Sequence, residues 1–307
     1  MTHKPKMMLF SKTLAKIKSR LGTRIFEALY RRMGRFYIED YPELSGTAFS
    51  RIYPTLLCHN IEILNYDADA NLVYLQKDGL CFCSTPDYPW ILREVFAQHI
   101  YFIHPKYLKT QEYVVFDFGM NRGYASLYFA SQSWCKAVHG FELNEYTFAL
   151  AQENVALNPK LSSDIALYNY GLGNKDEQLE CYYLPHRDGI CTTSYDFLKE
   201  YAPEELDKVV KKAISIRKVS SVMQGILDTM DPGQRIVLKI DVEGAEYDIL
   251  ADLMTAFPAF LERVDVIIGE AHMGMDPIMQ TLTPFGFKEV SQKNYNPKTQ
   301  DFLFIRA

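Results

Sequence analysis

One short stretch of the chain combines an acid with glycines at a spacing that suits ligand binding. In "VVFDFGMNRG" an apolar run ends at Asp117 and is followed by Gly119, Asn121 and Gly123 on alternate positions. Glycines let the backbone approach a ligand closely, and a following helix would offer free N–H groups to an anionic group. The stretch is neither G-x-G-x-x-G nor a P-loop, so it does not predict a dinucleotide or nucleoside triphosphate site.

A second carboxylate favours a ligand that contains a ribose. Glu142 ends the next apolar segment, 25 residues after Asp117. A carboxylate at that place can accept hydrogen bonds from both ribose hydroxyls, and such bonds contribute about 1.5 to 3 kcal/mol each. We therefore expect a nucleoside-type ligand with a free ribose rather than NAD or FAD.

Two further segments carry the candidate catalytic residues. Asp241 and Glu243 lie in "KIDVEGAE", at the end of one expected strand, and Glu270 and His272 follow the next strand. These groups could act as a general base or bind an acceptor. Three acids and a histidine could also chelate a divalent ion, which stays an alternative, and we assign no metal ligand. Glu246 is equally well explained as an acid that stabilises a helix N-terminus.

The pattern of elements around these residues predicts an α/β fold. From residue 113 onward, apolar runs alternate with amphipathic segments, as a parallel sheet with helices on both faces requires. The ligand-binding residues should then meet at the carboxyl edge of the sheet. A charged helix is also expected over 203–213. The expected parallel strands are 113–119, 136–142, 164–173, 235–241 and 264–270, followed by an antiparallel hairpin of 287–291 and 301–307.

These motifs resemble the FkbM-type methyltransferases, which are class I S-adenosylmethionine-dependent enzymes. The resemblance covers about residues 90 to 305 and is most specific in "LKIDVEGAEYDIL". It implies the class I methyltransferase fold, with a Rossmann-like, seven-stranded, mostly parallel sheet, and S-adenosyl-L-methionine as the cofactor. It places the glycine-containing loop around the methionine end of the cofactor and Glu142 on the ribose. The cofactor-binding residues that it implies are Asp117, Gly119, Met120, Asn121, Gly123, Glu142 and Leu143.

We therefore expect a methyltransferase that methylates a hydroxyl of a small molecule, sugar or glycan-type acceptor, the hydroxyl being implied by the family. Methyl transfer from a sulfonium is a direct displacement, so positioning supplies most of the acceleration and a general base removes the proton. The candidate catalytic residues are Asp241, Glu243, Glu270 and His272. Two other classes stay open: a catalytically silent nucleoside-binding protein that engages a membrane or nucleic acid through a basic N-terminus, and a metal-dependent hydrolase.

The charge distribution sets residues 1–35 apart from the rest of the 307-residue chain. They hold ten Lys or Arg and one acid, a net charge of +9, which leaves −14 for the remainder. We predict a basic N-terminal extension (1–35), a cap region (36–112) and the methyltransferase domain (113–307). The extension could contact an anionic membrane surface peripherally, and we do not expect a nucleic-acid partner.

The remaining composition indicates an ordinary globular protein of the cytoplasm. No apolar run is long enough to cross a bilayer, and the first residues lack the pattern of a secretory signal. The six cysteines show no C-x-x-C spacing. We therefore expect mostly buried, reduced thiols rather than a structural metal site.

Overall fold

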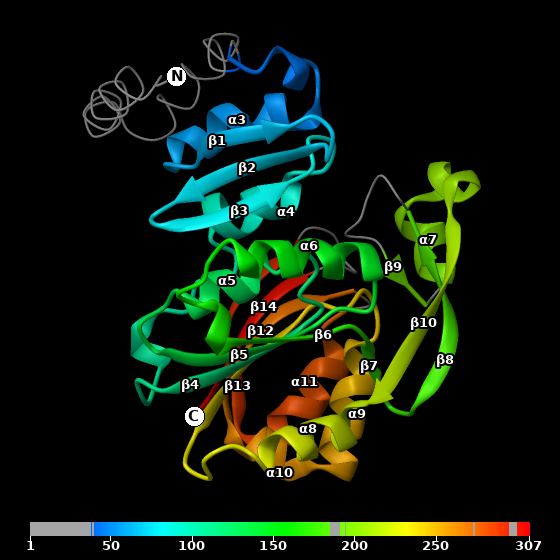
Figure 1. Cartoon of the computed structure of the whole chain (residues 1–307). Coiled ribbons are helices and arrows are strands. Elements are labelled where there is room, and N and C mark those ends of the chain that lie inside the picture. The colour runs from blue at the N-terminus through cyan, green and yellow to red at the C-terminus, as the bar shows by residue number, and fades with distance from the viewer. Residues whose placement is uncertain (1–37, 39, 185–190, 194, 273, 295–299) are drawn as a thin grey trace. The chain divides into compact units, whose positions relative to one another are not determined.

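The computed structural model describes residues 38, 40–184, 191–193, 195–272, 274–294 and 300–307. The chain divides into two compact units, Met1–His99 and Ile100–Ala307 (Figure 1). The basic extension predicted over 1–35 lies outside the described residues. Among the helices that the structure describes, none is both long and apolar enough to cross a membrane.

The first unit contains a three-stranded antiparallel meander and short helices. Strand β2 contains "LVYLQ" and pairs with β3, which is "LCFCS", and a helix in two segments spans Trp90–Gln98. Its Phe96 stacks on Phe82 of β3, with ring centroids 4.5 Å apart. The elements are η1 (Pro42–Leu44), α3 (Ala48–Cys58), β1 (Glu62–Asp67), β2 (Leu72–Lys77), β3 (Leu80–Ser84), α4 (Trp90–Arg93) and η2 (Glu94–Gln98).

The second unit is built on a seven-stranded sheet, which confirms the predicted class I methyltransferase fold. The strand order is β13-β14-β12-β11-β4-β5-β6. The five strands from β12 to β6 are parallel to one another, and the hairpin of β13 and β14 is antiparallel to them through β14. All six residues of β4 are buried, as expected for a central strand covered on both faces. The strands are β4 (Tyr113–Phe118), β5 (Cys135–Phe141), β6 (Ile165–Tyr168), β11 (Arg235–Ile240), β12 (Val264–Ala271), β13 (Phe287–Asn294) and β14 (Gln300–Arg306).

Helices cover both faces of this sheet. Figure 1 shows α5 and α6 on one face and α8 to α11 on the other. The second group packs its apolar residues, such as Leu250 and Phe260, against Phe116 and Leu238 of the central strands in one continuous core. The elements are η3 (Pro105–Tyr107), α5 (Tyr124–Ala130), α6 (Glu145–Ala156), η4 (Ser162–Asp164), α8 (Val219–Leu227), α9 (Glu246–Ala256), α10 (Pro258–Arg263), α11 (Asp276–Leu282) and η6 (Thr283–Phe285).

A second sheet, of order β7-β10-β8-β9, was not foreseen from the sequence, and it corrects two expectations. The single strand expected over 164–173 breaks after Tyr168, and its second part joins this other sheet. The helix expected over 203–213 is a 3-10 helix as far as Lys208 and is wrong beyond it, because residues Val210 to Ile216 pair with β8 and Ile214 is buried. The elements are β7 (Gly171–Gly173), β8 (Glu177–Tyr183), β9 (Cys191–Thr192), α7 (Tyr195–Tyr201), η5 (Pro203–Lys208) and β10 (Val210–Lys218).

The cysteines follow the expected burial. Four of the six, Cys58, Cys83, Cys181 and Cys191, are buried. The last two lie in β8 and β9 and pack with Ile214 in the small core of the second sheet. These two cysteines therefore act as apolar packing residues of the second sheet, in line with the prediction of mostly buried thiols.

Candidate active site

The candidate residues meet at one edge of the large sheet. Asp117 pairs with Lys239 across β4 and β11, and Phe118 lies opposite Phe141 of β5. Ile240 lies opposite Gly269 of β12. The segments that follow these four strands therefore leave the sheet side by side at its carboxyl edge, where ligands bind in open α/β sheets.

The loop after β4 follows a path that requires glycine at position 119. Gly119 has a φ of 75°. A Cβ atom there would lie 1.8 Å from the carbonyl oxygen of Asp241. On the other side, the N–H groups of Gly119 and Met120 donate to the carbonyl of Phe141 at 3.1 and 2.9 Å. The loop is thus fixed between β11 and β5 by its main chain.

The remaining loop residues are placed by the same close packing. Asn121 has a φ of 52°, and Gly123, with a φ of 75°, begins α5 against Ala151 of α6. The side chain of Met120 is buried, and Gly140 makes room for it, because a Cβ at Gly140 would lie 2.5 Å from the Met120 sulfur. Met120 therefore offers only its backbone to a ligand.

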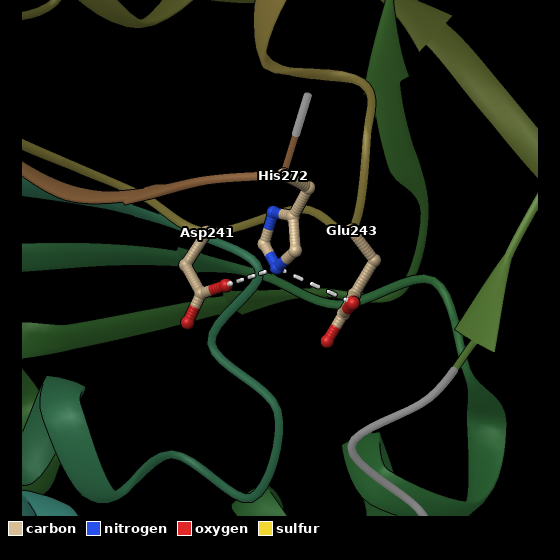
Figure 2. Close-up of side chains that lie close together, drawn as sticks. All are labelled: Asp241, Glu243 and His272. Atoms are coloured by element: carbon tan, nitrogen blue, oxygen red, sulfur yellow. Dashed lines mark ion pairs between the residues drawn. The ribbon is translucent and has the colours of Figure 1, made fainter. Parts of the chain in front are cut away.

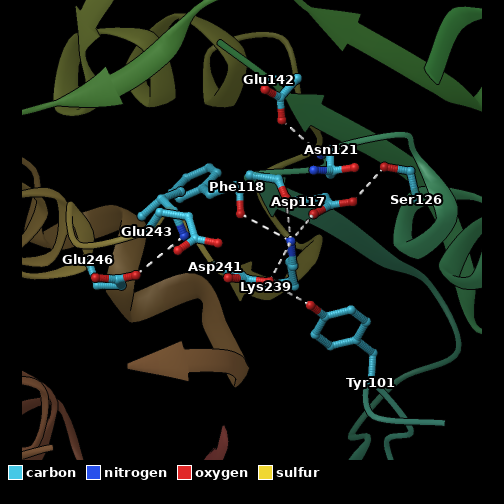
Figure 3. Close-up of polar contacts among 12 residues, drawn as sticks. Tyr101, Asp117, Phe118, Asn121, Ser126, Glu142, Lys239, Asp241, Glu243 and Glu246 are labelled. Atoms are coloured by element: carbon cyan, nitrogen blue, oxygen red, sulfur yellow. Dashed lines mark hydrogen bonds and ion pairs between the residues drawn. The ribbon is translucent and has the colours of Figure 1, made fainter. Parts of the chain in front are cut away.

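Glu142 faces this loop, as the prediction of a ribose site requires. Its Oε2 accepts a hydrogen bond from the Asn121 N–H at 2.9 Å (Figure 3). Its Oε1 accepts one from the Asn144 N–H at 2.7 Å. Burial raises the pKa of Glu142, and these N–H donors oppose the rise. A carboxylate has about four lone-pair positions, and the side chain of Thr147 also hydrogen-bonds Glu142, so these bonds leave an acceptor position for a ligand. Leu143, the next residue, packs against the core of the second sheet.

Lys239 is a buried cation beneath the loop that sequence reasoning missed. Its Nζ lies 3.1 Å from Asp117 Oδ1 and donates to the carbonyl of Gly119 at 2.6 Å (Figure 3). Burial alone disfavours its charge, but Asp117 and Asp241 raise the pKa of Lys239. Ser126 donates to the other oxygen of Asp117 at 2.6 Å. The sequence feature that could have indicated this buried cation is a lysine inside the apolar run "RIVLKI", two residues before Asp241.

His272 lies between two of the predicted catalytic acids. Its Nε2 is 3.4 Å from Glu243 Oε2 and 3.9 Å from Asp241 Oδ1, and Figure 2 shows the ring pointing between the two carboxylates. The ligand atoms of these three residues all lie within 4.8 Å of one another. Burial would lower the pKa of His272, but the surrounding carboxylates raise it well above its usual value.

Glu246 holds the other side of the His272 ring. Its Oε1 lies 2.6 Å from His272 Nδ1 and accepts hydrogen bonds from the N–H groups of Val242 and Gly244 at 3.3 and 3.2 Å. The side chain is fully buried at the first turn of α9. Glu246 lies in the first turn of α9, as its helix-terminus explanation requires, but it bonds the turn that precedes the helix rather than the N–H groups of the helix itself. It also orients His272, a candidate catalytic residue.

Glu243 is presented by a tight turn after β11. Its φ is 53°, and Gly244 follows with a φ of 105°. Thr192 of β9 donates to the Glu243 carbonyl at 3.0 Å, which ties the second sheet to this turn. Burial and the charge of Asp241 raise the pKa of Glu243 to about 7, whereas the His272 charge opposes the rise. The side chain is thus an acid that can exchange a proton near neutral pH.

Tyr101 and Glu270 complete the acidic side of the edge. Tyr101 donates to Asp241 Oδ2 at 2.8 Å, and no local motif could have indicated this contact across 140 residues of chain. Glu270 is the last residue but one of β12 and lies opposite Asp301 of β14. Burial and the charge of Asp241 raise the pKa of Glu270 to about 9. Glu270 is not part of the group that Asp241, Glu243 and His272 form.

Comparisons with known proteins identify the family of the chain. A family model described as "Methyltransferase FkbM domain" matches residues 117–302. Methyltransferase sdnD from Sordaria araneosa is 29% identical over 177 residues, which cover 52% of this chain and 67% of that protein.

Two solved structures show weaker similarity. Methyltransferase FkbM from Methylobacillus flagellatus KT aligns at 15% identity with a TM-score of 0.42, over 64% of this chain and 44% of that chain. TrmK from M. capricolum, in complex with S-adenosyl-homocysteine, aligns at 10% identity with a TM-score of 0.37, over 65% of this chain and 64% of that chain. The match thus spans less than half of the first of these structures.

Proposed function

Because this chain belongs to the FkbM methyltransferase domain family, we propose that it transfers a methyl group from S-adenosylmethionine to a hydroxyl of a small molecule, sugar or glycan-type acceptor. One observation carries the proposal. The loop after β4 contacts Glu142 through the Asn121 N–H and contacts the backbone of Asp241 at Gly119. A donor bound on this loop would therefore lie between a ribose-binding carboxylate and the acidic side of the edge.

The loop residues fit the donor by their chemistry. Gly119 and Gly123 carry no side chain, and the side chain of Met120 is buried, so the main chain itself can line the site. Glu142 keeps an acceptor position for a ribose hydroxyl. When bound, S-adenosylmethionine supplies a methyl group on a sulfonium. The ion pair of Lys239 with Asp117 holds the loop in place from below.

The acidic side suits an acceptor that must lose a proton. Replacement of O–H by O–CH3 releases a proton, which a carboxylate of Asp241, Glu243 or Glu270, or His272, would accept. A general base contributes about 10² to 10⁴ in rate when its pKa lies near the working pH. Glu243 fits this requirement best, because its pKa is raised to about 7. Tyr101 fixes the Asp241 carboxylate beside it through a 2.8 Å hydrogen bond.

Calorimetry with S-adenosylhomocysteine tests the donor site. We expect the wild-type chain to bind this product and Glu142→Ala to bind it at least about tenfold more weakly, because charge-assisted hydrogen bonds are lost. Glu145→Ala is the matched control, since Glu145 is exposed three residues further along. Its affinity should equal that of the wild type. An equal effect of both substitutions would remove Glu142 from the site.

A screen of hydroxyl-bearing acceptors then tests the reaction, with formation of S-adenosylhomocysteine followed by mass spectrometry. Binding of the product together with turnover supports the enzyme. Binding without turnover on any acceptor would favour the catalytically silent nucleoside-binding protein. A metal-dependent hydrolase predicts no binding at all, so the calorimetric experiment separates it from the other two.

A further inference from the structure

We propose that Asp241, Glu243 and His272 bind one divalent metal ion. Their ligand atoms come from the ends of two neighbouring strands and lie within 4.8 Å of one another (Figure 2). Nitrogen and carboxylate ligands lie about 2.0 to 2.2 Å from a transition-metal ion, so two of them can be up to about 4.4 Å apart. The separations of 3.4 and 3.9 Å from His272 Nε2 fall within that limit. Sequence alone assigns no metal ligand here, because it does not show that these atoms converge.

The orientation of His272 is that of a metal ligand rather than of a surface ion pair. Its side chain is 3% exposed, its Nδ1 lies 2.6 Å from Glu246, and its Nε2 points between Asp241 and Glu243. Metal-binding histidines almost always give their second ring nitrogen to a carboxylate or carbonyl, which fixes the ring and the tautomer. Glu246 is itself held by two backbone N–H groups. The histidine is therefore fixed in place before an ion arrives.

The charges around the group favour a dication. The described carboxylates on this side of the edge include Asp241, Glu243, Glu246 and Glu270, with Asp301 of β14 opposite Glu270. The nearby ammonium of Lys239 lies 3.8 Å from Asp241 Oδ2 but 3.1 Å from Asp117 Oδ1, so much of its charge is matched by Asp117. A bound dication would offset the excess negative charge that remains.

The mixture of one nitrogen and two oxygen ligands indicates which ions fit. Imidazole suits first-row transition metals, whereas Ca²⁺ and Mg²⁺ are held mainly by oxygen. Three protein ligands leave coordination positions open for a substrate. The role of the ion rests on the proposed function: it would bind the acceptor hydroxyl and lower its pKa. With Asp241, Glu243 and His272 held as ligands, Glu270 would be the group that accepts the proton, in place of Glu243. An ion with five or six ligands would keep at least two open positions, which favours an acceptor with two neighbouring oxygens, such as adjacent hydroxyls of a sugar.

Titration of the full chain with Mn²⁺, followed by electron paramagnetic resonance without donor or acceptor, tests the site. We expect one bound ion per chain, with ¹⁴N coupling from a directly bound imidazole in the pulsed spectrum. Asp241→Asn and His272→Ala should each weaken binding at least about tenfold, and His272→Ala should also abolish the ¹⁴N coupling. Glu262→Gln, an exposed carboxylate of α10, is the control and should bind as the wild type does.

Glu246 is a positioning residue in this proposal, and Glu246→Gln should weaken Mn²⁺ binding about 10- to 100-fold while the ¹⁴N coupling remains. Absence of Mn²⁺ binding, or binding without ¹⁴N coupling in the wild type, would overturn the site. This wild-type measurement decides even if a variant does not fold, which circular dichroism would reveal.

The metal site and the proposed methyl transfer can fail separately. Binding of S-adenosylhomocysteine without Mn²⁺ binding would overturn the metal site and leave the methyltransferase intact. Methyl transfer at an unchanged rate in EDTA, in a chain that binds Mn²⁺, would overturn the role of the ion toward the acceptor. Loss of turnover in EDTA that Mn²⁺ restores is the expected result.

Discussion

The two halves of the carboxyl edge hold their acids in different ways. In the loop half, which comprises Asp117, the loop of residues 119–123 and Glu142, each carboxylate has close partners in Ser126, Lys239 or backbone N–H groups. The acidic half comprises Asp241, Glu243, Glu246, Glu270 and His272, in which the carboxylates outnumber the cations.

This difference indicates that the loop half fixes the shape of the site, whereas the acidic half carries the groups that can react. Acids of the loop half have close partners within the protein, so they can hold a backbone path with or without a ligand. Crowding and burial raise the pKa values of Glu243 and Glu270 in the acidic half. An arrangement that raises pKa values in this way is typical of a functional site. The acidic half is therefore where we expect proton transfer or ion binding.

The largest effect is expected for Gly119→Ala in the loop half. The added Cβ would lie 1.8 Å from the Asp241 carbonyl oxygen, so the loop must move away from β11. We expect a loss of at least about 3 kcal/mol in the free energy of unfolding, measured with urea, and loss of S-adenosylhomocysteine binding.

Gly286→Ala is a matched control for this substitution. Gly286 has a φ of 78°, close to that of Gly119, but a Cβ there would meet no atom within 4 Å. Its cost should be only the left-handed backbone strain, about 1 to 2 kcal/mol. Equal destabilisation by the two substitutions would show that the contact of the loop with β11 is unimportant.

Lys239→Met should be the next most damaging change. It leaves Asp117 buried without its countercharge, which typically costs about 3 to 5 kcal/mol. Addition of Asp117→Asn removes the unpaired charge, so the double variant should be more stable than Lys239→Met alone in urea unfolding. Strictly additive losses would show that the two residues are not coupled.

Lys239 also shows where sequence reasoning reaches its limit. The strand ends and their order along the chain could be predicted, because apolar runs that end in Asp117, Glu142, Asp241 and Glu270 are local patterns. The meeting of these ends then follows from the geometry of a parallel sheet. Lys239 itself is visible in its strand, but its partner depends on which strand lies beside it.

The parts that could not be predicted depend on distant pairing. Residues 210–213 have a helical pattern, yet the antiparallel partner β8 makes them a strand. Tyr101 reaches Asp241 from a segment with no motif of its own. The second explanation of Glu246 appeared only when its carboxylate was seen against His272.

Tyr101→Phe tests the acidic half with a smaller change. It removes a hydrogen bond of 2.8 Å to the Asp241 carboxylate. Hydrogen bonds to charged groups contribute about 1.5 to 3 kcal/mol, compared with about 0.5 to 1.5 kcal/mol for neutral ones. We expect a loss in that upper range in urea unfolding and a lower kcat, because Asp241 loses its orientation.

Tyr247→Phe is the control for Tyr101→Phe, since its hydroxyl donates to the neutral carbonyl of Gly274 at 2.9 Å. It should cost less in stability than the first substitution. A larger loss from the control would contradict the view that Asp241 depends on Tyr101.

The smallest effect is a dependence on pH, which Glu270→Gln should reveal. Burial and neighbouring charges raise the pKa of Glu270 to about 9 from its usual 4.5, so between these values the folded chain keeps a proton that the unfolded chain releases. The stability contributed by this group is therefore lost as pH rises from about 5 to about 9. Because the side chain is half-buried, solvent partly screens its charge and the effect should be modest.

Urea unfolding in EDTA at pH 5, 7 and 9 measures this dependence without interference from a bound ion. Relative to the wild type, Glu270→Gln should gain stability as the pH rises, whereas Glu262→Gln, at an exposed position, should show no such trend. A constant difference across the range would mean that the acidic half is not short of positive charge. The contrast between the two halves would then lie in geometry alone, and the need for a cation beside His272 would lose its electrostatic support.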